Sequence, residues 1–83
     1  MQDQRAEYDE ARDRLYVQLL DESVDNTVAL DDRRSVDYAA DGRIVGVQFA
    51  KPFAGGINLS GIPLARVVGA LILQSGHKFR MVE

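Results

Sequence analysis

Apolar and polar residues alternate along two runs, 36–40 and 43–49, that flank the dipeptide Asp41-Gly42. Alternation with a period of two is typical of a strand with one buried face, and Asp-Gly is a strong signal for a hairpin turn. A two-residue turn of type I′ pairs Ala40 with Arg43, Tyr38 with Val45, Val36 with Val47 and Arg34 with Phe49. This register predicts an apolar face made of Val36, Tyr38, Val45, Val47 and Phe49. The opposite face receives Ser35, Asp37, Ala39, Ile44, Gly46 and Gln48.

Three shorter runs before this hairpin also have the pattern of strands, at residues 5–8, 15–20 and 27–30. In the second run Leu15, Val17 and Leu19 lie on one face of the strand. Short polar turns separate the runs, so we expect consecutive strands to pair as neighbours. Residues 7–50 therefore predict an antiparallel β-meander of four to five strands.

The pattern changes after Phe49, because Lys51-Pro52 removes a donor that a strand ladder requires. We interpret residues 51–62, which include Gly55-Gly56, as a linker. Apolar residues then recur at helical spacing, at Leu64, Val67, Val68, Leu71 and Ile72. They predict a helix over 63–75, with Ser60 or Gly61 near its N-cap, Pro63 in its first turn and Gly76 at its end. Residues 78–82 alternate as a last strand, which gives a single α+β domain over 1–83 with the helix packed on the sheet.

The outer face of the predicted helix is unusually poor in charge. It carries Arg66, Gly69, Ala70 and Leu73, where a solvated helix more often shows Glu and Lys. We expect this face, or the edge of the strand that contains Val82, to form an interface between copies of the chain. The alternative is an ordinary surface helix, since single exposed apolar residues are common.

Length and charge also favour association. A chain of 83 residues buries only about 60–65% of its unfolded surface, so a homodimer would add to a small core. Residues 1–42 hold twelve acidic residues and five arginines, a net charge of −7, whereas residues 43–83 hold five basic residues and one acidic residue, +4. Such a chain can attract a small basic protein or a second copy, unless folding interleaves the two halves. The acidic total disfavours nucleic acid as the main partner.

Several classes of protein are disfavoured by what the sequence lacks. It contains no cysteine, which excludes a disulfide framework and thiolate chemistry. No secretory signal is visible near Met1, and no apolar run approaches the roughly 20 residues of a membrane span. We therefore expect a cytoplasmic protein that does not bind membranes.

Candidate chemistry is sparse. His77 is the only histidine, and Ser60 lacks the glycine-flanked elbow of a nucleophile. Four acidic residues could suggest a cation site, Asp31, Asp32, Asp37 and Asp41, but they lack the spacing of a calcium loop. Gly55-Gly56 precedes the predicted helix, but the residues that complete a phosphate-binding motif are missing beside these two glycines. We expect no catalytic residues, no metal and no cofactor.

A set of strand and turn motifs resembles a known family. The motifs are Tyr8-Asp9, Asp13-x-Leu15-Tyr16-Val17, Thr27-Val28 and Val36-Asp37-Tyr38-x-x-Asp41-Gly42-Arg43-Ile44-Val45-Gly46-Val47. Over residues 7 to about 50 the chain resembles the small bacterial proteins grouped as domain of unknown function 2283 (DUF2283). The resemblance implies a compact cytoplasmic protein, rich in sheet and without catalytic residues. Some members are encoded beside small toxins that resemble ribosome-dependent ribonucleases, which implies an antitoxin role by association only.

The chain departs from this family in two places. Gln48 stands where relatives often have Glu, and residues 57–83 extend beyond the short family members. We therefore expect a non-enzymatic interaction module that self-associates, with a small toxin as a further candidate partner. The alternative is a ligand-binding protein or weak enzyme that uses Asp37, Tyr38 and a pocket between the sheet and the Gly55-Gly56 loop.

Overall fold

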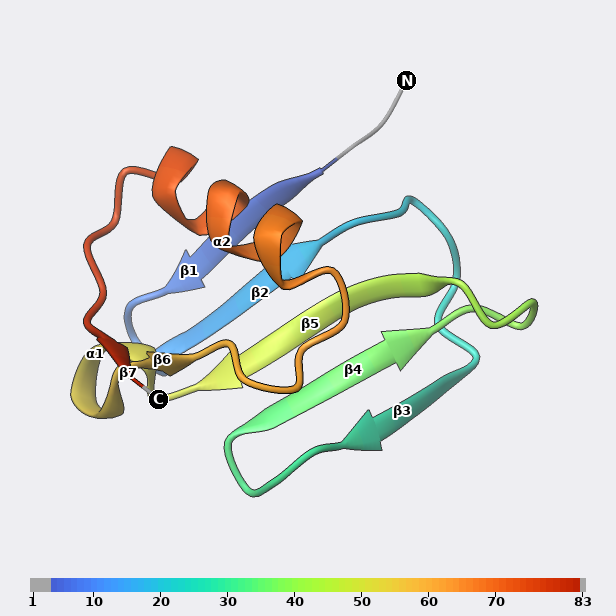
Figure 1. Cartoon of the computed structure of the whole chain (residues 1–83), viewed down its shortest axis with the longest axis horizontal. Coiled ribbons are helices and arrows are strands. Elements are labelled where there is room, and N and C mark those ends of the chain that lie inside the picture. Colours follow the sequence, from blue (N-terminus) through green and yellow to red (C-terminus); the bar gives the residue numbers. More distant parts are fainter. Residues whose placement is uncertain (1–3, 83) are drawn as a thin grey trace.

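A computed structural model describes residues 4–82 of the chain as a five-stranded antiparallel sheet with one longer helix on one face (Figure 1). Residues 1–3 and Glu83 lie outside the described residues. The prediction that no secretory signal is present near Met1 therefore falls partly on residues that the structure does not describe. The elements, in chain order, are β1 (Arg5–Asp9), β2 (Arg14–Gln18), β3 (Asn26–Ala29), β4 (Arg34–Tyr38), β5 (Ile44–Ala50), α1 (Pro52–Gly55), β6 (Ile57–Asn58), α2 (Ala65–Gln74) and β7 (Met81–Val82). The predicted α+β class is confirmed.

The order of the strands differs from the predicted meander. It is β1-β2-β5-β4-β3, so β5 lies between β2 and β4, and β3 is at an edge. β5 is seven residues long and has no exposed residue, whereas all four residues of β3 are exposed. The most apolar strand, β5, is therefore the central strand of the sheet and is paired on both edges, with β2 and with β4. Residues 19–25 pass one end of the sheet to reach β3, and the four strands β2 to β5 have the order of a Greek key (Figure 1).

The turn between β4 and β5 has three residues and is not the predicted two-residue turn. The Ala39 N–H donates to the Arg43 carbonyl at 2.8 Å, and the Gly42 N–H donates to the Ala39 carbonyl at 3.0 Å. Gly42 has φ +88°, while Asp41 does not have the positive φ that a type I′ turn requires. Three-residue hairpin loops commonly end on such a glycine. The Asp41 carboxylate stabilises the turn by accepting the Arg43 N–H at 3.1 Å.

A β-bulge in β5 restores the predicted register beyond the turn. Tyr38 pairs with Ile44 and Asp37 with Gly46, which leaves Val45 as the extra residue. The pairs Val36 with Val47 and Arg34 with Phe49 are then as predicted. The expected pair of Tyr38 with Val45 is wrong, because the bulge brings Ile44 opposite Tyr38. Both of these side chains pack against the core.

The core lies between one face of the sheet and the segment after β5. Its buried members share apolar side chains and come from both layers: Leu15, Val17, Leu19, Val36, Val47, Phe49, Ile57, Ile62, Val68, Leu71 and Ile72. Two residues predicted on the inner face of the helix, Leu64 and Val67, are instead 55% and 37% exposed. The helix starts later than predicted, and Leu64 occupies its N-cap in a left-handed conformation at φ 56°. Ser60, Gly61 and Pro63 therefore precede the helix, and Ser75 is its C-cap.

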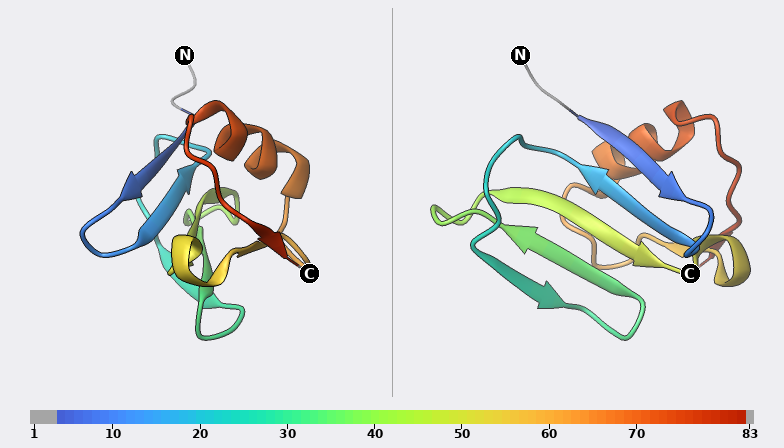
Figure 2. Two further views of the ribbon diagram at one scale, coloured as in Figure 1. Left: turned by 90° about the vertical axis from the view of Figure 1, so that its left-hand side faces the viewer. Right: turned by 180° about the vertical axis from the view of Figure 1, so that it is seen from behind.

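The predicted linker contains regular structure. α1 and β6 both fall within residues 51–62, and β6 pairs in parallel with β7. The last strand is Met81–Val82 and not 78–82, because Phe79 turns to pack against Tyr8 and the core. Figure 2 shows α2 and the β6–β7 pair on the same side of the sheet. No helix within residues 4–82 has the length and apolar character needed to cross a membrane.

Candidate functional site

The predicted interface face of α2 lines an apolar groove. Arg66, Ala70 and Leu73 are exposed and Gly69 is half-buried, and all four border the same cavity of about 490 Å³. The remaining lining residues are Leu59, Ala65, Ile72 and Met81. Leu73 is 81% exposed and Met81 51% exposed, which is unusual for side chains of this size. Helical spacing predicted that the α2 residues share a face. Leu59 and Met81 line the same groove only because the chain folds back onto α2, which the sequence did not indicate.

Gly69 keeps the middle of this groove open. A Cβ atom at Gly69 would lie 3.3 Å from Cδ1 of Leu59, so any larger side chain would fill the space above Leu59. Val82, the fifth residue of the predicted interface, does not join this groove. It pairs with Asn58 and borders a different cleft beside Gly55 and Gly56.

The charged residue on α2 interacts unfavourably with the dipole of the helix. The first turn has no acidic residue and the last turn has no basic residue. Arg66, the second residue of the helix, places a cation near the positive end of the helix dipole. This arrangement is unfavourable within one copy of the chain.

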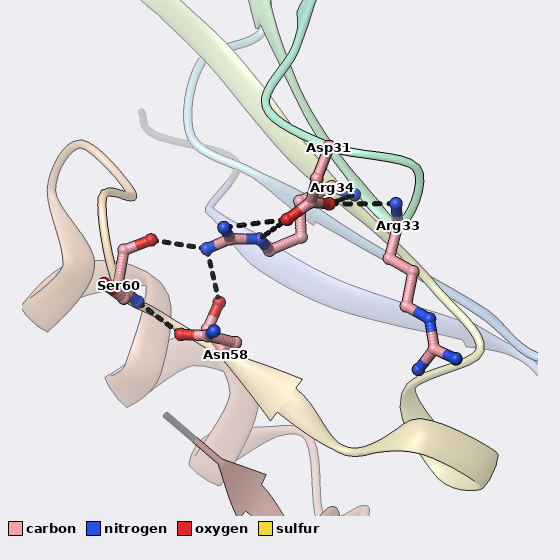
Figure 3. A network of polar contacts seen from close by, with 5 residues as sticks. All are labelled: Asp31, Arg33, Arg34, Asn58 and Ser60. Atoms are coloured by element: carbon pink, nitrogen blue, oxygen red, sulfur yellow. Dashed lines mark hydrogen bonds and ion pairs between the residues drawn. The ribbon is translucent and has the colours of Figure 1, made fainter.

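A second cavity, of about 180 Å³, lies between the β3–β4 turn and Gly55-Gly56. Arg34, whose side chain is 14% exposed, forms one wall and connects the sheet to the C-terminal segment (Figure 3). Its Nε and Nη2 each lie 2.9 Å from Oδ2 of Asp31. Its Nη1 donates to the carbonyl of Asn58 at 3.1 Å and also to the carbonyl of Ser60. The hydrogen bond from Arg34 is the main reason that the pKa of Asp31 is lowered.

Arg33 also lines this cleft and has no partner for its guanidinium among residues 4–82. The group lies against Gly55, where a Cβ atom would collide with Nη1 of Arg33. At Gly56, which has φ +79°, a Cβ atom would instead lie 2.8 Å from the backbone carbonyl oxygen of Arg80. Gly55 therefore makes room for a guanidinium group and Gly56 for a backbone carbonyl, and sequence reasoning missed both features.

A third cavity, of about 390 Å³, is lined by aromatic side chains beside Glu10 and Lys78. The Tyr8 ring contacts His77 at 5.2 Å and Phe79 at 5.0 Å between centroids, both edge to face. None of the hydrogen bonds described within residues 4–82 joins His77 to Ser60, which lies beside Arg34.

Asp13 connects two residues that line this cavity, Tyr8 and Phe53. Its carboxylate accepts hydrogen bonds from the Tyr8 hydroxyl at 2.8 Å and from the N–H groups of Phe53 and Ala54 at 3.0 and 3.1 Å. Desolvation works to raise the pKa of Asp13, but these hydrogen bonds outweigh it and lower the pKa. Desolvation and the bond to Asp13 raise the pKa of Tyr8 to about 12.

Asp37 and Tyr38 do not join the Gly55-Gly56 cleft, contrary to the ligand-binding hypothesis. Asp37 accepts hydrogen bonds from the hydroxyls of Tyr16 at 2.9 Å and Thr27 at 2.6 Å, while Tyr38 packs against the core. Desolvation, followed by the bond to Asp37, raises the pKa of Tyr16. Across residues 4–82, no three side chains of metal-binding types lie together.

The comparison with protein families agrees with the strand motifs. Residues 5–50, more than half of the chain, match the family model described as "Protein of unknown function (DUF2283)". The chain is therefore a small α+β protein that belongs to the DUF2283 family. This match covers β1 to β5 and ends before α1, so the groove on α2 lies outside the matched segment. No curated protein and no solved structure matches the chain.

Proposed function

We propose that this protein is a non-enzymatic interaction module that self-associates as a homodimer through the groove on α2. The observation that carries the proposal is Leu73, which is 81% exposed beside an apolar cavity of about 490 Å³. A leucine in this position is costly to leave in water and gains free energy when a second surface covers it.

A second copy suits this groove better than an unrelated surface. In a two-fold arrangement with antiparallel α2 helices, Leu73 of each copy approaches the region of Gly69 and Arg66 of the other. Small residues at the crossing allow close packing, and the stem of Arg66 covers part of Leu73. Each Arg66 then lies near the negative end of the partner's helix dipole. This favourable interaction offsets the unfavourable one between Arg66 and the dipole of its own helix.

Light scattering at high micromolar concentration tests this proposal. We expect a dimer for the unchanged protein and a monomer for Leu73→Glu and Gly69→Glu, because each places a charge in the shared apolar surface. Gln74→Glu is the matched control, since it adds the same charge at an exposed position outside the groove. A monomer at all concentrations, or equal effects of Leu73→Glu and Gln74→Glu, would contradict the proposal.

The Gly55-Gly56 cleft supports a second candidate function, the binding of a small anion. Arg33 offers a guanidinium without a side-chain partner among the described residues 4–82, in a cleft of about 180 Å³, and a guanidinium is a preferred partner for carboxylate and phosphate. Thermal denaturation with inorganic phosphate and a panel of metabolites tests it. We expect a rise in Tm that Arg33→Gln abolishes and Arg12→Gln preserves. An unchanged Tm with every compound would remove this candidate.

The family resemblance adds a third candidate, in which the acidic N-terminal half neutralises a small basic toxin. The support is the charge of −7 over residues 1–42. Co-expression with the product of a neighbouring reading frame tests it, with relief of growth inhibition as the expected result. A neighbourhood without a small basic protein would leave this candidate without support.

A further inference from the structure

The two edges of the sheet are built differently. The edge strand β1 alternates charged residues with others, at Arg5, Glu7 and Asp9, and α2 packs over it. Charged side chains on an edge discourage another strand from pairing there. β3 (Asn26–Ala29) has no charge, no proline and no bulge in its pairing with β4, and all four of its residues are exposed. The backbone groups of β3 that face away from β4 are thus open to a further strand.

Apolar side chains accompany this open edge. Val24, Val28 and Leu30 are 48%, 44% and 40% exposed. Val28 pairs with Val36, which is fully buried, so Val28 lies on the face of the sheet that carries the core. α2 covers this face over β1 and β2 but does not reach β3 (Figure 1). An added strand with apolar residues on this face would extend the core beyond Val28.

The surroundings of the edge are acidic. Residues 21–32 contain five acidic residues and no basic residue. Glu22 is paired with Arg43 and Asp31 with Arg34. None of the ion pairs described within residues 4–82 includes Asp21, Asp25 or Asp32. Negative charge therefore remains at both ends of β3.

We propose that β3 binds an extended basic segment of another protein, which adds to the sheet as a sixth strand. Backbone hydrogen bonds would hold the segment, its apolar residues would cover Val28, and its Lys or Arg residues would approach Asp25 and Asp32. A second copy of β3 fits poorly, because pairing in either direction brings acidic ends together. The proposal concerns a surface separate from the α2 groove and does not depend on dimerisation.

Nuclear magnetic resonance of the full ¹⁵N-labelled chain tests the proposal with a capped peptide of about eight residues that alternates lysine and valine. We expect chemical-shift changes at residues 24–32 and binding that weakens with salt. A glutamate–valine peptide of the same length should bind at least about tenfold more weakly. Methylating alternate backbone nitrogens of the lysine peptide on its pairing edge should weaken binding by about tenfold or more, because edge hydrogen bonds are lost.

Variants of the protein sharpen the test. Val28→Lys should abolish binding of the lysine–valine peptide, whereas Glu7→Gln, which changes the net charge by the same amount at the other edge, should preserve it. Leu73→Glu should also preserve it, which separates this result from dimerisation through α2. The peptide comparison uses the unmodified protein, so it decides the matter even if Val28→Lys does not fold. Equal binding of both peptides, no binding, or shifts located at α2 would overturn the proposal.

Discussion

Asp13 joins three parts of the molecule through one carboxylate. It adopts a left-handed conformation at φ 50° in the turn after β1, where Asp is tolerated better than most residues. From there it binds the Tyr8 hydroxyl and the first turn of α1. The family motif includes Asp13, but the sequence could not reveal its role as a helix cap, because the helix lies forty residues away in the chain.

Asp13→Ala should destabilise the fold. Three hydrogen bonds and a favourable left-handed residue are lost together, so we expect the free energy of unfolding to fall clearly more than for an ordinary surface substitution. Urea denaturation measures this change. Asp32→Ala is the control, because none of the hydrogen bonds or ion pairs described within residues 4–82 involves its side chain, and we expect an effect below about 0.5 kcal/mol. Similar losses in the two variants would contradict the role given to Asp13.

The lowered pKa of Asp13 also predicts how stability depends on pH. Its stabilising contribution is complete above the unfolded pKa of about 3.9 and is lost as pH falls through the lower folded pKa. The free energy of unfolding should therefore decrease on acidification below about pH 5, and less steeply for Asp13→Ala. Urea denaturation in a series of buffers tests this slope. Identical slopes for both proteins would show that other groups control the acid response.

The hairpin between β4 and β5 shows how far local patterns can be read at the scale of an element. Alternation and Asp-Gly located both strands and the pair of Val36 with Val47. The sequence did not indicate the three-residue turn or the bulge at Val45, because several loop lengths accept a glycine at this position. The bulge also connects β5 to the end of β2, since the Val45 carbonyl accepts the N–H groups of Leu19 and Leu20 at 2.7 and 3.1 Å.

Gly46 in β5 is required by the strand beside it. Tyr16 crosses over Gly46 to reach Asp37, and a Cβ atom at Gly46 would collide with its ring and lie 2.8 Å from the Val17 carbonyl oxygen. Gly46→Ala should therefore lower the free energy of unfolding by about 1–3 kcal/mol in urea denaturation. Gly69→Ala, in the middle of α2, is the comparison. Its added methyl group would lie 3.3 Å from Cδ1 at the flexible end of Leu59, which must shift by a few tenths of an ångström, while helix propensity improves, so we expect no loss.

The order of elements in the whole molecule depends on contacts between distant residues. Hydrophobic patterning identified the five strands of the sheet and α2 but missed α1 and β6, and several connections could join the elements that it found. The central place of β5 follows from its burial against β2 and β4, and the pairing of β6 with β7 follows from the return of the chain past Gly56. For the same reason, only the α2 side of the candidate groove could be predicted from the sequence. Helical spacing gave Gly69 and Leu73, while Leu59 and Met81 arrive through tertiary structure.

Arg34 connects the two layers of the molecule. Because its largely buried guanidinium binds Asp31 on one side and the carbonyls of Asn58 and Ser60 on the other, Arg34→Gln should lower the free energy of unfolding by about 2–3 kcal/mol. Hydrogen exchange should accelerate more in residues 57–82 than in β1 and β2. Arg33→Gln, beside it and without a side-chain partner among residues 4–82, should change stability by less than about 0.5 kcal/mol. Equal effects of both substitutions would contradict this connecting role.

The open, acid-flanked edge at β3 has a consequence for how the protein is handled. At neutral pH, the net charge of −3 makes molecules repel one another, which disfavours extension of one sheet by the next. Near the sequence pI of about 5.0 the net negative charge disappears, while the unprotected strand and its exposed valines remain. Mildly acidic storage should therefore favour growth of fibres from this edge, and moderate alkalinity should keep the solution clear.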